Sequence, residues 1–454
     1  MQCRRLEHYD KKRFVEIFWE DGAVEITSGA TGTKGRTRDF NLGPAAGEAF
    51  VAAEVAKRLR EGFVEVVPEV VRAKDARHVV PDASWIARIA AAYDDDVPRL
   101  VYADHLQSLG DPLGELIAVQ CELARIDRWE ARAGELRERE ETLLRTYRQR
   151  WLPKLEPEIR CTFRRGFVEH VAIDTSVPAA SFERLMQHAP LVRSFEHDGI
   201  RYWLSGPPWQ SAAKLLPQLT GLALRGWPGR VVNLHDLLGN PQLRGIERLA
   251  LRACGMSPGE LEPISTRAWR ELDLHNNVLG LRGTEMALAD VSRLETLDLG
   301  SCGIGDSGAA AIAAAPFARL RQLKLRRSQL TAVSLRRLAR SPQLSTLEVL
   351  DVSGNAGASG LFDSPELPAL RELDVSETEL DDDGLAALLA SPLAAQLRVL
   401  DVSGNNLTDA RLFIEAELPE LRVLEVSRNA LGERAKELKA SLPHVRVTAR
   451  NSST

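Results

Sequence analysis

The stretches LRELDVSET (370–378), LRVLDVSGN (397–405) and LRVLEVSRN (421–429) are three copies of one nine-residue phrase. Leucine fills positions one and four, an aliphatic residue fills position six, and a small polar residue usually fills position nine. Similar copies begin 23 to 27 residues apart, at Leu219, Ile246, Trp269, Leu294, Leu320 and Leu347. A fixed period in this range predicts a stack of repeating units, because one unit alone cannot bury its apolar face.

The apolar pair in each copy predicts a short strand. Leu373 and Val375 are two residues apart, so both would point to the same face of that strand. Segments between copies, such as 308–316 (GAAAIAAAP) and 384–390 (GLAALLA), have helical character. We therefore expect nine parallel strands along the inside of a coil, roughly 40 Å long at about 4.8 Å per strand, with helices outside. The phrase closely resembles the leucine-rich repeat, which implies an α/β fold, a leucine-rich repeat solenoid or horseshoe.

Position nine has a structural explanation of its own. The chain must bend there, and the bend leaves backbone groups without strand partners. A small side chain that bonds them avoids a penalty of about 1–3 kcal/mol per orphaned buried group. Only the first copy breaks the rule, with Trp227; the other copies carry Cys254, Asn277, Cys302, Ser328, Asn355, Thr378, Asn405 and Asn429.

Composition and charge favour no special environment. The 454 residues are 44% apolar and 27% charged, and the net charge of -5 gives no global argument for nucleic acid or an anionic membrane. The five cysteines form no CxxC pair, the start lacks an apolar signal core, and no run reaches membrane-spanning length. We therefore expect a cytoplasmic protein with reduced thiols.

Residues 1–75 predict a small unit of strands followed by a helix over 44–61. The first 66 residues resemble the WGR domain, known from DNA-dependent poly(ADP-ribose) polymerases, at Gly29, Gly32, Gly35, Phe40, Lys57, Leu59, Gly62 and Phe63. Where that family has Trp-Gly-Arg, which contacts the DNA end, this chain has Ser28-Gly29-Ala30. Phosphate contacts by Lys34, Arg36 and Arg38 are one interpretation. A solvated charged face is the other, and the 13 basic and 13 acidic residues of this segment favour it.

Residues 82–160 are expected to form a helical domain. The runs PRLVYADHL (98–106) and GDPLGELI (110–117) resemble a bacterial "repeat-companion" domain found beside leucine-rich repeats, which often has Trp where His105 stands here. The charge-dense stretch 122–150 is expected to continue as one helix. Asp104, His105, Asp111 and Glu115 invite a catalytic or metal-binding interpretation, but no metal-ligand spacing such as HExxH accompanies them, and Asp111 reads as a helix cap.

Residues 161–218 contain weaker copies of the phrase, around 166–173 and 191–195. We expect two atypical repeats there that cap the array of 219–450. An irregular insertion, RYWLSGPPW (201–209), lies between them and the clean copies. Its aromatic residues would either seal the end of the coil or form a binding lip; they are Tyr202, Trp203 and Trp209.

Residues flanking the buried pair predict the exposed inner face. Position five is acidic in most copies, and position seven carries hydroxyls in the last ones. The predicted protein-binding strip consists of Asp273, Asp298, Asp351, Asp374, Asp401, Glu425, Ser353, Ser376 and Ser403. Stacked carboxylates repel one another unless a cation is present, so the strip would suit a Lys/Arg-rich partner. The alternative is that aspartate is simply common in this repeat. Charge reversal at Asp351, Asp374 and Asp401 is expected to abolish partner capture without unfolding the protein.

The function predicted from sequence is a non-enzymatic protein-interaction scaffold without catalytic residues, metal or cofactor. The GxGxxG match at 303–308 falls in phase with the repeats and lacks the βαβ context of a dinucleotide site. No membrane or small-molecule substrate is expected. Two alternatives stay open: a nucleic-acid adaptor tethered through the WGR-like segment, and a regulator of an enzyme, of nuclease-inhibitor or GTPase-activator type, which rests on fold analogy.

Overall fold

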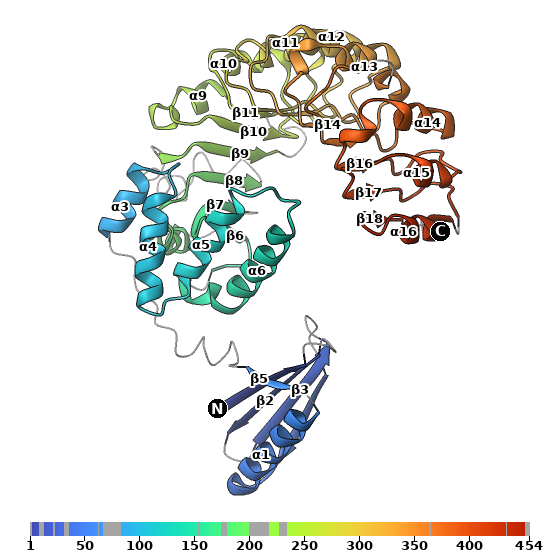
Figure 1. Cartoon of the computed structure of the whole chain (residues 1–454). Helices are drawn as coiled ribbons and strands as arrows, with labels where there is room; N and C mark the ends of the chain where they lie inside the picture. The colour runs from blue at the N-terminus through green and yellow to red at the C-terminus, as the bar shows by residue number, and fades with distance from the viewer. Residues whose placement is uncertain are drawn as a thin grey trace. The chain divides into compact units, whose positions relative to one another are not determined.

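The chain divides into two units in the computed structural model (Figure 1). The first comprises Met1–Lys154 and Arg164–Phe167, and the second Leu155–Phe163 and Val168–Thr454. The structure describes residues 2–8, 13–20, 23–30, 36–61, 63–66, 83–152, 155–173, 179–198, 218–226, 234–362, 365–432 and 434–449. The finer division at 75, 82, 160 and 218 stays a prediction.

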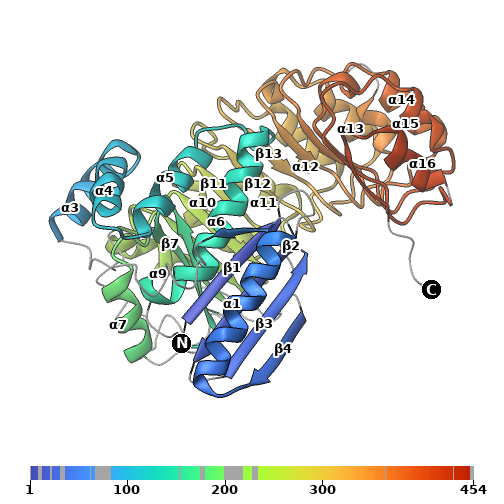
Figure 2. The ribbon, with the colours of Figure 1, turned by 60° about the horizontal axis from the view of Figure 1, so that its bottom comes forward.

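The first unit begins with an antiparallel sheet of five strands in the order β4-β3-β2-β1-β5. Helix α1 (Pro44–Arg60) lies along one face of this sheet (Figure 2). Alternation explains the packing: in β3, Val24 and Ile26 are buried while Glu25 is exposed, and the buried side chains meet Val55 of α1 in one core. The strands are β1 (Gln2–His8), β2 (Arg13–Glu20), β3 (Ala23–Ala30), β4 (Arg36–Asn41) and β5 (Val64–Val66).

Four helices follow in the first unit: α3 (Ala83–Ala91), α4 (Val97–Ser108), α5 (Leu113–Leu123) and α6 (Ala131–Trp151). The N-cap residue of α5 is Pro112, and the cap expected at Asp111 lies one residue earlier: the buried Asp111 carboxylate accepts the Leu113 N–H at 2.9 Å. The expected single helix over 122–150 is wrong. Asp127 accepts the N–H of Trp129 at 3.0 Å, and this local turn interrupts the helix although the charge pattern runs through it.

The second unit contains a sheet of thirteen strands in the order β18 to β6. Parallel pairing runs from β7 to β18, and the nine sequence copies correspond to β9–β17. The strands are β6 (Ile159–Arg164), β7 (Phe167–Ile173), β8 (Ser194–Asp198), β9 (Gly221–Arg225), β10 (Arg248–Arg252), β11 (Glu271–Asp273), β12 (Thr296–Asp298), β13 (Gln322–Lys324), β14 (Val349–Asp351), β15 (Glu372–Asp374), β16 (Val399–Asp401), β17 (Val423–Glu425) and β18 (Arg446–Thr448).

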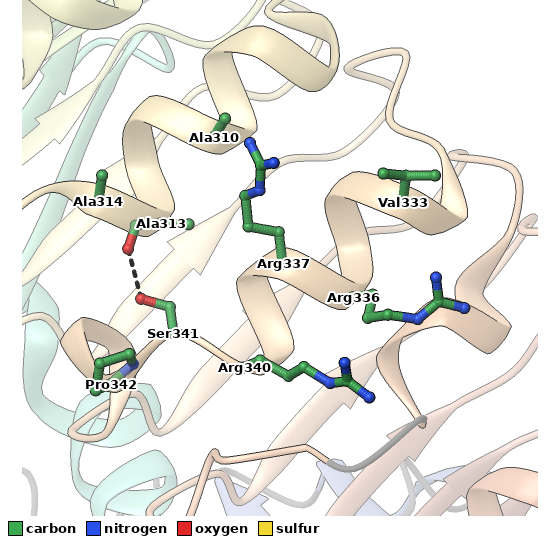
Figure 3. Close-up of a pocket in the computed structure, with 9 residues that line it drawn as sticks. All are labelled: Ala310, Ala313, Ala314, Val333, Arg336, Arg337, Arg340, Ser341 and Pro342. Carbon is green, nitrogen blue, oxygen red and sulfur yellow. Dashed lines mark hydrogen bonds between the residues drawn. The ribbon is translucent and has the colours of Figure 1, made fainter.

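The strands form the inner side of the coil, and the helices lie on its outer side (Figure 1). The expected helical segments are confirmed in α12 and α14. Neighbouring outer elements are also bonded to each other: Ser341 Oγ donates to Ala313 O at 2.6 Å (Figure 3). The outer helices are α7 (Ala179–His188), α9 (Leu234–Gly239), α10 (Glu262–Ser265), α11 (Gly280–Ala287), α12 (Gly305–Ala314), α13 (Ala332–Ala339), α14 (Asp382–Ala390), α15 (Arg411–Glu415) and α16 (Arg434–Ser441).

The position-nine side chains bond successive coils together, as predicted. The Asn405 amide donates to Val375 O at 2.8 Å and Val402 O at 2.9 Å, and its oxygen accepts the N–H groups of Thr378 and Leu380 at 2.9 and 3.0 Å. Asn277 and Asn355 repeat this arrangement. Cysteine and serine at position nine also bond neighbouring coils, since the buried Cys302 and Ser328 each donate a hydrogen bond to a carbonyl of the preceding coil. Trp227, the exception, lies outside the described residues.

Position eight has a feature that the sequence reading did not anticipate: its backbone is left-handed in eight successive copies. Six of these residues are not glycine, and for each of them the left-handed conformation costs about 1–2 kcal/mol. The stack stabilises the conformation, because position-eight N–H groups donate to the position-seven carbonyl of the next coil, as from Glu377 to Ser403 O at 2.9 Å. The eight are Ala253, Asn276, Ser301, Arg327, Gly354, Glu377, Gly404 and Arg428.

Candidate functional site

The position-five side chains stand next to one another across the parallel strands. We call the acidic ones the acidic column: Asp273, Asp298, Asp351, Asp374, Asp401 and Glu425. Pairing places them in direct register, interrupted only where Lys324 stands between Asp298 and Asp351. All six are partly buried, so each carboxylate reaches the inner surface without being fully hydrated.

Each carboxylate of the acidic column also has a structural role. It accepts the N–H group two residues further on, at the point where the chain leaves its strand. The distances are 3.0 Å at Asp273, 2.9 Å at Asp298, Asp351 and Asp374, 2.8 Å at Asp401 and 3.2 Å at Glu425. This local bond explains why aspartate recurs in the repeat without any partner. Substitution by lysine would remove the acceptor as well as the charge.

The position-seven hydroxyls are less accessible than the sequence reading expected. Ser353, Ser376 and Ser403 are 4%, 9% and 7% exposed. Ser353 Oγ donates to Asp351 Oδ1 at 2.6 Å, so this hydroxyl faces its own carboxylate. The burial arises because the chain turns at position eight directly beside these side chains. Their role in protein binding stays a prediction, and they offer a partner little surface.

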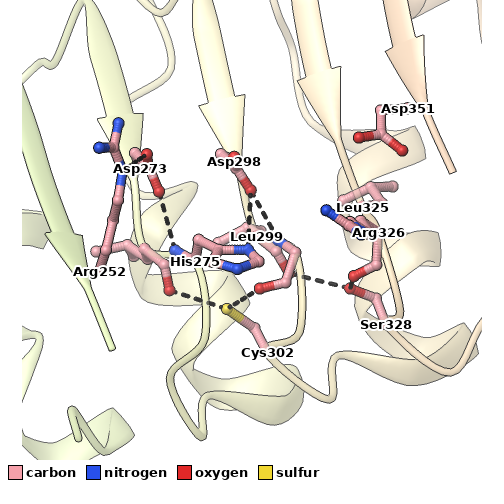
Figure 4. Close-up of polar contacts among 12 residues, drawn as sticks. Arg252, Asp273, His275, Asp298, Leu299, Cys302, Leu325, Arg326, Ser328 and Asp351 are labelled. Atoms are coloured by element: carbon pink, nitrogen blue, oxygen red, sulfur yellow. Dashed lines mark hydrogen bonds and ion pairs between the residues drawn. The ribbon is translucent and has the colours of Figure 1, made fainter. Parts of the chain in front are cut away.

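In the first half of the acidic column the charges are paired within the protein. The Arg252 guanidinium lies 2.6 Å from Asp273 and 3.8 Å from Glu196. His275 Nδ1 lies 3.9 Å from Asp298 (Figure 4). Burial, followed by repulsion from Asp273, raises the pKa of Asp298. A partner would have to compete with the internal cation Arg252 and with the His275 ring.

In the second half, the carboxylates of Asp351, Asp374, Asp401 and Glu425 form no ion pair with any residue that the structure describes. Burial, with added repulsion from Asp351 and Asp401, raises the pKa of Asp374 to about 6 despite the hydrogen bonds from Ser376. Burial and the neighbouring Glu425 also raise the pKa of Asp401. These four carboxylates therefore form a crowded, half-desolvated row of like charge that an external cation would stabilise.

A further charged cluster on this face was missed by the sequence reading. Glu377 pairs with Arg327 and with Arg428, the latter at 2.9 Å, and each partner lies two coils away. Glycines stand between them: a Cβ at Gly354 would lie 2.4 Å from Arg327 Cγ, and one at Gly404 2.9 Å from Glu377 Cγ. Position eight of successive copies reads Arg, Gly, Glu, Gly, Arg, so aligning the copies would have revealed the cluster.

The residues predicted to contact phosphate belong to the first unit, whereas the acidic column belongs to the second. Arg36 and Arg38 are exposed on one face of the edge strand β4, opposite Ser28 and Ile26 of β3. Lys34 lies outside the described residues, as do Tyr202, Trp203 and Trp209. The possible phosphate contacts and the binding lip therefore stay predictions.

The residues weighed for catalysis in the helical segment have structural partners. The Glu115 carboxylate forms an ion pair with Arg139 at 2.6 Å, and the His105 ring stacks on Trp85 with centroids 5.9 Å apart. The Asp111 carboxylate accepts the Leu113 N–H at the start of α5, and Asp104 is exposed. Among the residues that the structure describes, no group of three or more His, Cys, Asp or Glu could hold a metal ion. Nor does any helix within those described ranges have the length and apolar character needed to cross a membrane.

Comparison with known proteins finds the repeats directly. The family model described as Leucine Rich repeat matches residues 293–313, 367–389 and 396–410. These segments contain β12, β15 and β16, the start of each outer segment, and position nine at Cys302, Thr378 and Asn405. No curated protein matches the chain.

Solved structures show more distant likenesses. A Bacteroides fragilis protein is 15% identical, with 100% of this chain and 96% of that one covered and a TM-score of 0.33. The yeast Rad7 and Elc1 complex is 16% identical, with 81% of this chain and 94% of that one covered and a TM-score of 0.45. An internalin from Listeria monocytogenes is 14% identical, with 63% of this chain and 82% of that one covered and a TM-score of 0.32. These likenesses are too remote to bring a partner to this chain. The second unit thus contains leucine-rich repeats, and its long parallel sheet fits a leucine-rich repeat solenoid.

Proposed function

We propose that the protein is a non-enzymatic interaction scaffold that binds a protein partner with a Lys/Arg-rich surface on the inner face of its solenoid. The observation that carries this proposal is the row Asp351, Asp374, Asp401 and Glu425, which are adjacent on parallel strands and form no ion pair with the described residues. Lys324 is next to Asp351 in the sheet, and the positive charge of Arg428 acts on Asp401 from a distance. The contact centre is the second half of the acidic column, because Arg252 and His275 already pair with the first half.

Magnitudes support the choice of a cationic partner. Neighbouring unit charges about 5 Å apart repel by roughly 1–3 kcal/mol, depending on how far water screens them. Burial is the main cause of the raised pKa of Asp374, and repulsion from Asp351 and Asp401 adds to it. A lysine or arginine placed between two of these carboxylates would replace repulsion with attraction. The attraction would weaken as salt is added, since these groups remain partly open to solvent.

The first test removes charge without removing the structural hydrogen bonds. Asn retains an oxygen that can accept the N–H two residues on, so the triple variant Asp351→Asn, Asp374→Asn, Asp401→Asn preserves the strand ends that lysine would break. We expect this variant to fold and to melt at or slightly above the temperature of the unmodified protein, but to lose the proteins that the full chain captures from native lysate.

A matched control removes three carboxylates elsewhere, through Asp383→Asn, Glu415→Gln and Glu417→Gln. These side chains are exposed, and the first two lie on the outer helices α14 and α15. The control variant should capture the same proteins as the unmodified chain. Capture that persists in the inner-face triple variant, or that is lost equally in the control, would contradict the proposal.

We further infer that the scaffold is a cytoplasmic bacterial protein with a WGR-like segment at 1–75 and a companion domain at 82–160. The support is the sequence resemblance, together with the compact sheet and helix of the first segment and the four helices of the second. Binding of the full chain to DNA ends at low salt, lost when Arg36 and Arg38 are replaced by glutamine, would instead favour the nucleic-acid adaptor.

A further inference from the structure

The outer side of the solenoid has a cavity of about 610 Å³ between helices α12 and α13. This volume lies within the range of roughly 300–1,000 Å³ that is usual for ligand sites. The α12 wall consists of Ala310, Ala313 and Ala314, which are spaced so that they share one helix face. Because alanine ends at Cβ, this wall leaves space where longer side chains would fill the groove.

The opposite wall is cationic. Arg336, Arg337 and Arg340 line it from α13 and the residue that follows the helix, with the exposed Val333 at the same helical stripe. Figure 3 shows Arg337 reaching from α13 towards Ala310 of α12. Within the described part of the chain, Arg337 makes no hydrogen bond or ion pair. Its guanidinium is therefore available to a ligand in the groove.

The arginine stripe is not a general property of the repeat. Of the four successive outer helices α11–α14, only α13 has basic residues in its last turn. Among the described residues of the lining, none has an acidic side chain. The exposed Glu366 comes near the end of α13, where its N–H donates to Ala339 O at 2.7 Å, but it does not line the cavity. The helix dipole favours one or two cations at the C-terminal end of a helix such as α13. It does not explain why the wall that faces them, on α12, is apolar.

We propose that this groove binds an acidic peptide segment of a partner protein, with apolar side chains against the alanine wall and a carboxylate on Arg337. Arg336 and Arg340 add positive charge to the same wall, although both also interact with other residues of the protein. Guanidinium groups bind carboxylates in bidentate geometry, and their methylene stems extend the apolar surface. The site is distinct from the acidic column and takes a ligand of opposite charge. The scaffold can thus hold two partners, a basic one inside the solenoid and an acidic one outside.

Peptide chemistry fits the groove better than nucleic acid. Nucleic-acid sites combine an extended basic track with aromatic side chains for base stacking. The groove has three cations on one helical stripe, and none of the described residues that line it is aromatic. The chain as a whole carries a net charge of -5. An alanine wall matches apolar side chains of a peptide, since it offers bases no stacking plane.

The test is selection of a random peptide library displayed on phage against the full chain, followed by fluorescence anisotropy of the enriched peptides. We expect the enriched peptides to contain Asp or Glu next to apolar residues. Affinity should fall about tenfold or more with Arg337→Glu plus Arg340→Glu, because the unpaired cation at Arg337 is lost and the two new carboxylates repel those of the peptide. A second variant, Ala314→Trp, fills the groove without altering any charge and should cause a similar loss.

Two controls make the result specific. Arg282→Glu reverses an exposed arginine on α11, outside the groove, and should leave peptide binding unchanged. The neutralised inner-face variant should also bind these peptides normally, so failure of this proposal and failure of the scaffold proposal are distinguishable. Enriched peptides without an acidic excess, or acidic peptides that bind Ala314→Trp as tightly as the unmodified protein, would overturn the assignment. So would labelled single-stranded DNA that binds in place of peptides and is lost in the double arginine variant.

Discussion

Replacing Asp374 by asparagine should stabilise the protein at high pH and have almost no effect at low pH. Burial, reinforced by repulsion from Asp351 and Asp401, raises the pKa of Asp374 from an ordinary 3.8 to about 6. The folded state therefore holds the proton more tightly than the unfolded chain. This group's contribution to stability is fully present below the unfolded pKa and is lost as pH rises through about 6. Asparagine stays neutral throughout and avoids that loss.

The magnitude follows from the shift. About two pKa units correspond to roughly 3 kcal/mol if the carboxylate were fully shielded, and solvent screening of this half-buried group reduces the figure to about 1 kcal/mol. The hydrogen bond from the Ser376 N–H, 2.9 Å long, is already included in the net shift, and asparagine can accept it too. For a unit of this size, 1 kcal/mol raises the melting temperature by about 2 °C.

The assay is thermal unfolding by circular dichroism at pH 3, 4, 5, 6 and 8, for the unmodified protein and Asp374→Asn. The melting temperatures should coincide near pH 3, where the aspartate is protonated in both the folded and the unfolded state. They should separate in favour of the variant between pH 4 and 6, and the difference should stay constant above about pH 7. Asp383→Asn, on the exposed start of α14, serves as the control and should show no such trend. A difference that does not change with pH, or a variant less stable at pH 8, would refute the reasoning.

Three further predictions follow from the same contacts. Asn405→Ala should lower the free energy of unfolding by about 3 kcal/mol in urea, because four backbone groups lose their hydrogen-bond partner. Asn429→Ala, at a less buried site, should lower it by less. Equal losses would argue against the role of the position-nine side chains in bonding successive coils. Gly166→Ala should destabilise the first unit, measured by protease resistance, since φ is +87° and the new Cβ would lie 2.0 Å from Ile117 Cγ1; unchanged resistance would contradict this. Capture of the basic partner should weaken between pH 7.5 and 5 as Asp374 is protonated through a pKa of about 6, and equal capture at both values would count against the acidic column.

The solenoid could be predicted from sequence because its determinants are local and repeated. Leu373 and Val375 are buried on one face, and Asn405 bonds two coils, as the nine-residue phrase requires. The register of the acidic column could also be predicted, because each of its side chains occupies position five of its copy. By contrast, the break between α5 and α6 depends on one turn at Asp127, which a charge pattern does not register.

The site was harder to predict than the fold, because exposure depends on how the chain leaves each strand. Ser353 lies on the expected face, yet the left-handed turn after it buries the hydroxyl against Asp351. The groove between α12 and α13 depends on two helices from different repeats, so reading each copy separately could not reveal it. The ion-paired cluster around Glu377 requires comparison of one position across five copies.

Carboxylate footprinting of the captured complex tests the scaffold proposal most directly. Solvent-accessible carboxyl groups are labelled with a carbodiimide and an amine, with and without the bound partner, and quantified by mass spectrometry. The account predicts that labelling of Asp351, Asp401 and Glu425 falls on binding, while labelling of the exposed Asp383 on α14 stays constant. Unchanged labelling of all three inner carboxylates in a complex that protects other residues would contradict it.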